Sequence, residues 1–319
     1  MKDKCIGFIG LGNLGSNLAN NILLGGYKLY IFDIDKNKSK KLLKKGAIWC
    51  NNLPSLVKQT SIIINCLPSL KAISDVMKSK NGVINHLNSK HLVIECSTTD
   101  EEHSLTIYKE IKLKSANYIE APLSGGEWKS KKGNISVFAC GKKSAYLRAL
   151  PILKEIGYEI LYLGNKIGSA STVKVLTNYL ASINLIAISE VFMICKKYNL
   201  NLKNVYEAIR ISSGNSFVHT SEGQLILSRS MNANFTMDLV CKDLSFVEKL
   251  RKKFNIPSKL IKEVQKTFLE GKKLLGDREY STAIVKILEK KSNDKLFSKG
   301  FPKYLKDVNP RRKGIEVIK

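Results

Sequence analysis

The chain has 319 residues, a length that indicates about two domains and leaves room for a buried core. Hydrophobic residues make up 44%, with 21 glycines and 7 prolines, which excludes disordered, collagen-like and low-complexity classes. The 53 basic residues outnumber the 27 acidic ones, but only seven are arginine, the residue preferred for reading nucleic acid, so the net charge of +26 favours a solvated lysine-rich surface over a nucleic-acid partner.

The first half of the chain alternates apolar runs with helix-like segments. Strands are expected at 5–9, 28–32, 61–67, 91–95, 118–121, 135–139 and 159–163. Helices are expected between them, for example at 15–24, 38–45 and 101–114. Strand–helix alternation with continuously apolar strands predicts an α/β fold, a mainly parallel, doubly wound Rossmann-like sheet covered on both faces.

A glycine-rich turn follows the first strand and opens the first helix. It reads Gly10-Leu11-Gly12-Asn13-Leu14-Gly15, the context in which the dinucleotide fingerprint binds a pyrophosphate at a helix N-terminus. Asp33 ends the second strand, where an acid accepts a ribose 2′-hydroxyl and repels a 2′-phosphate. The pattern predicts an NAD cofactor. NADP is left open because Lys36 and Lys38 are able to bind its 2′-phosphate.

After Gly168 the pattern becomes helical throughout. A long run covers 171–198, and further helices are expected at 202–211, 242–254, 258–270 and 282–290. These elements predict an NAD-binding domain over residues 1–165, an all-helical C-terminal domain over 166–291 joined by a long interdomain helix, and a basic tail over 292–319.

The cysteines and the termini bear on compartment and partners. Seven scattered cysteines with no C-x-x-C pair predict neither a disulfide framework nor a metal site and favour the reducing cytoplasm. The N-terminus runs directly into a strand rather than a signal peptide, and the apolar stretch 179–195 carries Asn184 and Glu190, so a packed helix is expected rather than a membrane span.

Further motifs occur in one order along residues 4–291. They are Asn65-Cys66-Leu67-Pro68, Glu95-Cys96-Ser97-Thr98-Thr99, Glu120-Ala121-Pro122-Leu123-Ser124-Gly125-Gly126, Gly168-Ser169-Ala170-Ser171-Thr172-Val173-Lys174-Val175-Leu176-Thr177-Asn178 and Lys242-Asp243-Leu244. With the glycine loop, this set closely resembles the β-hydroxyacid dehydrogenase family, which includes 3-hydroxyisobutyrate dehydrogenase and tartronate-semialdehyde reductase. The resemblance implies a Rossmann-like domain, a helical domain and a homo-dimer or tetramer.

The resemblance also implies roles for individual residues. Lys174 corresponds to the catalytic acid/base, and Asn178, four residues on and therefore on the same helical face, to a group that positions substrate or lysine. Ser124, Gly125 and Gly126 correspond to the segment that binds the substrate carboxylate. Leu67, Pro68, Thr98 and Lys242 correspond to residues that contact the cofactor.

The chain departs from the family pattern at two loops. Lys129 follows the Ser-Gly-Gly segment, which resembles threonate-type members and suggests a more polar or longer acid. Glu101 replaces the usual proline after the Ser-Thr segment. The sugar-phosphate branch, 6-phosphogluconate dehydrogenase, is disfavoured because its His-Asn-Gly-Ile-Glu stretch is missing around Asn178.

The sequence therefore predicts an NAD-dependent oxidoreductase that transfers hydride between nicotinamide and a small 3-hydroxy acid or the matching semialdehyde. Two alternatives remain open: a non-catalytic polyanion-binding protein on the same fold, and an imine reductase. Retention of Lys174, Asn178 and Ser124-Gly125-Gly126 argues against the first. The lysine at position 174 argues against the second, because imine reductases of this scaffold generally lack it.

Overall fold

The computed structural model describes residues 5–318, which divide into two compact units. Unit 1 consists of residues up to Lys174 together with those from Asp307 onward, and unit 2 consists of Val175–Lys306. The division between the units lies at Lys174, whereas the sequence-based prediction placed the domain boundary at residue 165 and assigned 292–319 to a basic tail. Its first part belongs to unit 2 and its last part to unit 1.

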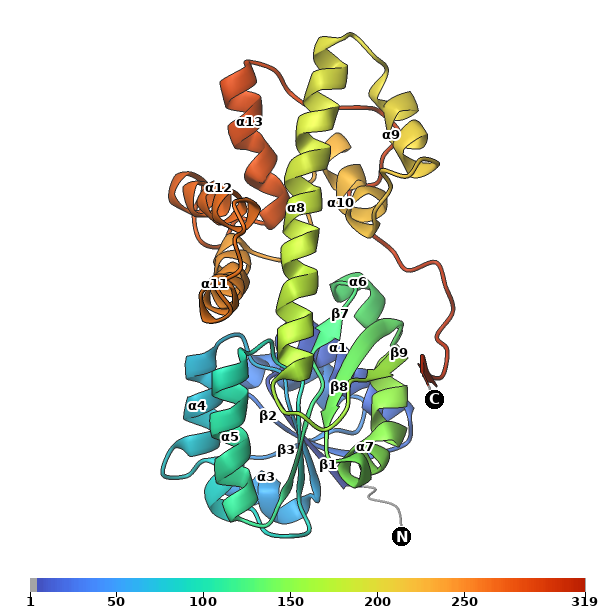
Figure 1. Cartoon of the computed structure of the whole chain (residues 1–319). Helices are drawn as coiled ribbons and strands as arrows, with labels where there is room; N and C mark the ends of the chain where they lie inside the picture. The colour runs from blue at the N-terminus through green and yellow to red at the C-terminus, as the bar shows by residue number, and fades with distance from the viewer. Residues whose placement is uncertain (1–4, 319) are drawn as a thin grey trace. The chain divides into compact units, whose positions relative to one another are not determined.

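Unit 1 is built on a ten-stranded sheet (Figure 1). The strand order is β10-β9-β8-β6-β5-β4-β1-β2-β3, with β7 paired to β8. From β3 to β6 every pair is parallel, and β6 pairs antiparallel with β8. The strands are β1 Cys5–Ile9, β2 Lys28–Phe32, β3 Ile48–Trp49, β4 Ile62–Asn65, β5 Leu92–Glu95, β6 Asn117–Glu120, β7 Leu123–Ser124, β8 Ile135–Gly141, β9 Gly157–Tyr162 and β10 Ile315–Glu316.

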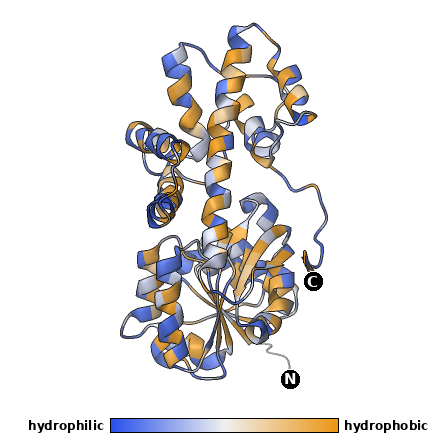
Figure 2. Ribbon diagram, viewed as in Figure 1, coloured by the Kyte–Doolittle hydropathy of each residue, from blue (hydrophilic) through white to orange (hydrophobic). Residues whose placement is uncertain are grey.

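Helices cover both faces of this sheet, as the apolar strands predict. The helical segments are α1 Asn13–Leu24, η1 Lys36–Ser39, α2 Lys40–Leu43, α3 Leu53–Gln59, α4 Leu70–Lys78, η2 Val83–His86, α5 Glu101–Leu113, α6 Glu127–Ser130 and α7 Lys143–Ile156. Ile62 and Ile64 pack in the core under α1 and α7, whereas Ile63 packs in the core under α3, α4 and α5. Successive residues of a strand thus serve opposite faces, which is why the strands are apolar throughout (Figure 2).

Unit 2 is helical, as predicted. Its segments are α8 Ser169–Lys197, which begins in unit 1, α9 Leu202–Arg210, α10 Phe217–Leu227, α11 Met237–Lys253, α12 Leu260–Leu275, η3 Ser281–Ile284 and α13 Val285–Ser292. Phe192, Leu244 and Phe268 are buried together in its core. The fold class predicted from the sequence, a Rossmann-like sheet followed by an all-helical domain, is confirmed.

Helix α8 is the one helix among residues 5–318 that is long and apolar enough to cross a membrane, with a mean hydropathy of 1.5 over its most apolar window. A buried core helix of a soluble protein meets the same two criteria. Leu185 and Phe192 of α8 are buried in the core of unit 2, whereas Leu180 and Ile194 are exposed, so only one face of α8 packs in that core.

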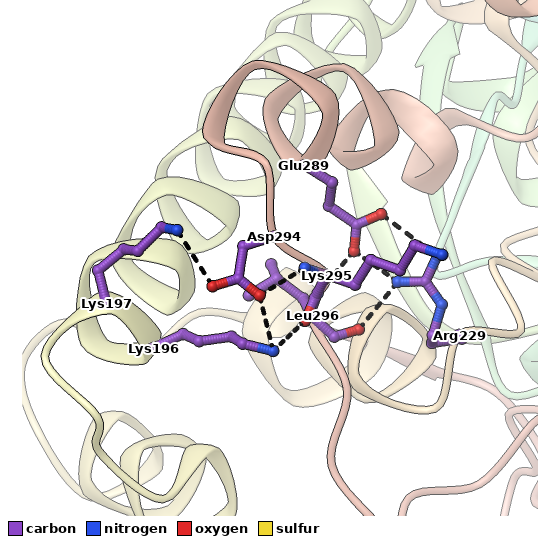
Figure 3. A network of polar contacts seen from close by, with 7 residues as sticks. All are labelled: Lys196, Lys197, Arg229, Glu289, Asp294, Lys295 and Leu296. Atoms are coloured by element: carbon purple, nitrogen blue, oxygen red, sulfur yellow. Dashed lines mark hydrogen bonds and ion pairs between the residues drawn. The ribbon is translucent and has the colours of Figure 1, made fainter.

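The segment 294–296, which follows α13, is held to the rest of unit 2 by a network of hydrogen bonds and ion pairs (Figure 3). Arg229 binds both carboxylate oxygens of Glu289 and donates to the carbonyl of Leu296, whose own N–H donates to Glu289 at 2.6 Å. Leu296 is fully buried. Lys196 and Lys197 pair with Asp294 at 3.0 and 3.2 Å, and these bonds help lower the pKa of that carboxyl to about 2.

The last residues return to unit 1 and extend its sheet. β10 pairs in parallel with β9, so it forms the edge of the sheet. The Asn134 amide donates to Asp307 at 2.6 Å and to the Pro310 carbonyl at 3.0 Å, and Arg311 pairs with Glu155 at 2.7 Å. Of the cations in this predicted basic tail, Arg311 pairs with Glu155 and Arg312 lies over the Tyr158 ring, so both contact unit 1.

This packing predicts that Asp307→Ala destabilises unit 1, because it leaves the buried Asn134 amide without its carboxylate partner. We expect a loss of about 1–3 kcal/mol in the free energy of unfolding. Both tryptophans, Trp49 and Trp128, lie in unit 1, so urea unfolding followed by their fluorescence reports on this unit. Val308→Ala is the matched control, because that neighbouring side chain is 89% exposed. Equal midpoints for the two variants would contradict the packing role.

Candidate active site

The glycine loop lies between β1 and α1 at the point where the strand order reverses, the usual ligand site of an open parallel sheet. Gly10 has φ +94°, and a Cβ there would collide with the Cys66 carbonyl. A Cβ on Gly12 would meet nothing within 4 Å, so the backbone at Gly12 is open to a ligand. No side chain caps the first turn of α1. These features fit a pyrophosphate held by backbone N–H groups.

Asp33 is tied to this loop. One of its carboxylate oxygens accepts the N–H of Leu11 at 2.6 Å, and the other accepts the N–H of Asp35 at 2.9 Å. Lys38 pairs with the same carboxylate at 3.4 Å, whereas Lys36 lies over the Trp49 ring at 5.8 Å. A carboxylate has about four acceptor positions, so one remains for a ribose hydroxyl.

The loops after β4 and β5 are joined to each other. The N–H of Leu67 donates to the Ser97 hydroxyl at 2.8 Å, and the Leu67 side chain lies beside Gly10. Thr98 follows directly, and Thr99 contacts the Ser171 hydroxyl at 2.7 Å. The structure thus brings Leu67 and Thr98, which the sequence separates by thirty residues, to one edge of the sheet.

The Ser124-Gly125-Gly126 segment connects β7 to α6. Gly125 and Gly126 have φ +124° and +83°, values that favour glycine. Asn17 and Asn21 of α1 donate to the hydroxyl and the carbonyl of Ser130, at 3.0 and 2.7 Å, and thereby hold α6 against α1. The segment is therefore anchored to the helix that carries the glycine loop. Sequence analysis missed both asparagines, although their spacing of four on α1 was a signal.

Lys174 lies in α8, one turn after Ser171. The Lys174 residue is 7% exposed, and Ser171 is buried against Thr99 and Glu120. Among 46 lysines a position this sheltered is unusual, because lysine is seldom buried without a partner or a function. Asn178 lies in the same helix four residues further on, as predicted.

Two predicted site residues of unit 2 meet at an acid that sequence analysis did not select. The Asn178 amide donates to Asp243 at 2.6 Å, and the Lys242 ammonium pairs with the same carboxylate at 3.4 Å. Asp243 is 3% exposed. The position of Asp243 beside Lys242 in the Lys-Asp-Leu motif was the sequence signal that could have identified it. The Asp243 carboxylate fixes the side chains of Asn178 and Lys242 within unit 2.

Thiol chemistry is disfavoured at this edge of the sheet. All seven cysteines are free. Burial raises the pKa of Cys66 to about 12 and that of Cys96 well above its usual value, so neither supplies a thiolate near neutral pH. Among residues 5–318 no group of three or more His, Cys, Asp or Glu side chains is arranged to hold a metal ion.

Comparisons with known proteins agree with this architecture. Residues 5–164 match the family model described as the NAD binding domain of 6-phosphogluconate dehydrogenase, and residues 168–288 match the one described as NAD-binding of NADP-dependent 3-hydroxyisobutyrate dehydrogenase. Fold, site and family models together define an NAD(P)-dependent oxidoreductase.

Individual relatives narrow this class. A 2-(hydroxymethyl)glutarate dehydrogenase of Eubacterium barkeri is 27% identical over 89% of this chain and 94% of its own. A 3-sulfolactaldehyde reductase of Escherichia coli K12 is 29% identical over 80% of this chain and 86% of its own. The crystal structure of a 3-hydroxyisobutyrate dehydrogenase from Salmonella typhimurium superposes with a TM-score of 0.81, at 22% identity, over 89% of this chain and all of that one. The chain belongs to the β-hydroxyacid dehydrogenase family, whose members are NAD(P)-dependent dehydrogenases of 3-hydroxy acids.

A buried carboxyl at the end of β5 makes stability depend on pH. Glu95 is 2% exposed, and burial, aided by the charge of Glu120, raises its pKa from 4.5 to about 7. Hydrogen bonds from Ser97 and Asn65 oppose this rise without cancelling it. Between pH 4.5 and 7 the folded state binds more protons than the unfolded state, so stability falls as pH rises through this window.

We expect Glu95→Gln to remove this dependence, because the neutral amide imitates the protonated carboxyl. Near pH 5 the variant and the parent should unfold at similar urea concentrations. Near pH 8 the variant should be more stable by roughly 2 kcal/mol, since a shift of this size is worth at most about 3 kcal/mol. Tryptophan fluorescence of unit 1 provides the measurement. A constant difference across the pH range would contradict the assignment.

Proposed function

We propose that this protein catalyses hydride transfer between NAD(H) and a small 3-hydroxy acid, or the corresponding semialdehyde, with Lys174 as general acid/base. The observation that carries the proposal is the burial of Lys174, which is only 7% exposed. Lys174 lies one turn of α8 after Ser171, and Ser171 is hydrogen-bonded to Thr99 in the loop that contains Thr98. Burial disfavours the charged form of an amine, the property a lysine needs to accept a proton near neutral pH.

The roles of the residues follow from the chemistry of alcohol oxidation. The bound nicotinamide supplies the hydride acceptor. Lys174 takes the proton of the hydroxyl group in oxidation and returns it to the carbonyl oxygen in reduction. Asn178, held by Asp243, positions the substrate, and Ser124, Gly125 and Gly126 bind its carboxylate through hydroxyl and backbone N–H groups.

The remaining candidate residues are assigned to the cofactor. In this proposal Gly10, Leu11, Gly12, Asn13 and Leu14 bind the pyrophosphate. Leu67, Pro68 and Thr98 contact the nicotinamide side, and Lys242 contacts the cofactor from unit 2. Asp33 retains an acceptor position for the ribose hydroxyl, which supports NAD as the preferred cofactor.

Assembly and compartment complete the proposal. Leu176, Leu180, Val191 and Ile194 form an exposed apolar stripe along α8. Such stripes mark protein–protein contacts, so we propose a homo-dimer or tetramer.

Seven free cysteines suit a reducing compartment, and we propose the cytoplasm.

Cofactor preference tests the role of Asp33. We expect kcat/KM to be at least about tenfold higher with NAD than with NADP, equivalent to about 1.4 kcal/mol. Asp33→Ser should reduce that ratio several-fold, because it removes the charge that repels a 2′-phosphate. Asp35→Asn is the matched control, since Asp35 is exposed and its side chain accepts the N–H of Asn37 at 3.0 Å, a bond that the asparagine oxygen can also accept. An unchanged ratio in Asp33→Ser would refute the assignment.

Turnover tests the role of Lys174. Lys174→Ala should lower kcat by a factor on the order of 10² to 10⁴, the usual worth of positioned proton transfer, and leave NAD affinity nearly unchanged. Lys174→Arg should be nearly as damaging, because a guanidinium group does not release its proton near neutral pH. The exposed Lys166, which precedes α8, serves as the control in Lys166→Ala. The measurements are initial rates with a panel of 3-hydroxy acids and the dissociation constant of NADH from its fluorescence.

Two outcomes would contradict the proposal. Turnover close to the parent in Lys174→Ala would mean that Lys174 transfers no proton in the rate-determining step. Loss of NADH affinity with kcat preserved would make Lys174 a cofactor contact, and Lys242 would then be the first candidate for the base.

A further inference from the structure

Two buried glutamates stand side by side at the ends of β5 and β6, and the function proposed above uses neither. Glu95 and Glu120 are register partners in the sheet and are 2% and 1% exposed. Glu95 bonds to Asn65 at the end of the neighbouring strand β4 and to the N–H of Ser97 in the loop that follows β5. The Glu120 carboxylate instead binds the start of α8.

The bonds of Glu120 hold two positions, three residues apart, where the chain enters α8. One carboxylate oxygen accepts the N–H of Gly168 at 2.7 Å, and the other accepts the hydroxyl of Ser171 at 2.5 Å. The Ser171 hydroxyl donates its proton to this oxygen of Glu120. Its oxygen is then free to accept from Thr99 at 2.7 Å or Ser104 at 3.1 Å.

This network ties the first turn of α8 to two loops of the sheet at once. Thr99, Ser104 and Ser171 are all buried, so water does not compete for their hydroxyl groups. Gly168 has φ +97°, and a Cβ there would press against the side chain of Glu101. The chain thus enters α8 by one defined path.

We propose that Glu120 is a positioning residue for Lys174, acting through Ser171 and Gly168. Ser171 and Lys174 are three residues apart and therefore adjacent on the helix surface. A helix turn fixed at Ser171 also fixes the backbone from which the Lys174 side chain projects. The inference rests on the proposed function, in which Lys174 transfers the proton. A displacement of about 1 Å at a reacting group costs on the order of 10²-fold in rate.

A merely structural role for Glu120 is the competing explanation, and Glu95 provides the control. Glu95→Gln and Glu120→Gln make the same change at equally buried, paired positions, but only Glu120 bonds to α8. In Glu120→Gln the amide nitrogen faces one of the two donors. Either the bond to the Gly168 N–H is lost, or the Ser171 hydroxyl turns to accept and its bonds to Thr99 and Ser104 are rearranged. The catalytic consequence should therefore appear in one variant and not in the other.

The experiment measures kcat, the KM of the hydroxy acid and the dissociation constant of NADH for the full chain. We expect Glu120→Gln to lower kcat about 10- to 100-fold while NADH affinity stays within about twofold. Glu95→Gln should keep kcat within about twofold. Thr99→Val should lower kcat and Thr99→Ser should retain it, since the serine keeps the hydroxyl group. The two Thr99 variants also decide the matter if Glu120→Gln fails to fold.

The double variant that combines Glu120→Gln with Lys174→Ala distinguishes the positioning role of Glu120 from the proposed function of Lys174. Glu120→Gln should not lower the residual rate of Lys174→Ala further, because a positioning residue has nothing left to position. Parent-like turnover in Lys174→Ala alone would overturn the proposed function. A large loss in Lys174→Ala with parent-like kcat in Glu120→Gln and Thr99→Val would overturn only the positioning role. Equal losses of kcat and NADH affinity in both glutamine variants would assign Glu120 to the fold alone.

Discussion

Five parallel strands of unit 1 end at the same level, and the candidate site depends on this register. Ile9 pairs with Phe32 on one side and Asn65 on the other, Asn65 pairs with Glu95, and Glu95 pairs with Glu120; each is the last residue of its strand. A slip of one residue would turn the side chains of a strand to the opposite face and move its loop by about 3.3 Å. The apolar contacts that hold the strands in register therefore also hold the loops that carry the site.

What could be predicted from the sequence follows from the same constraint. β1 and β2 were predicted with the bounds they have in the structure, because strands buried on both faces are continuous apolar runs that end at a glycine or an acid. Gly10 and Asp33 were expected at one site from the dinucleotide fingerprint, and Leu67 and Thr98 were expected there from the family resemblance. The strands β3, β7 and β10 escaped prediction because two residues carry no periodicity.

The supporting polar contacts could not be predicted, because they join residues far apart in sequence. Glu120 meets Ser171, Asn134 meets Asp307, and Asn178 meets Asp243. Each of these side chains is equally compatible with a solvated surface, and a single sequence does not indicate which serine a buried glutamate binds. The last thirty residues illustrate the difficulty. Their charge predicted a basic tail, whereas β9, Asn134 and Glu155 provide partners for its last part.

The return of the chain end to unit 1 has a consequence for synthesis on the ribosome. The sheet of unit 1 reaches its final edge only when β10 has been made, after the whole of unit 2. Until then β9 is an unprotected edge strand, the kind of surface on which nascent chains pair with one another. The N-terminal part of the chain therefore does not form the complete sheet of unit 1 by itself. The order of translation leaves β10 to be added after unit 2 has been made.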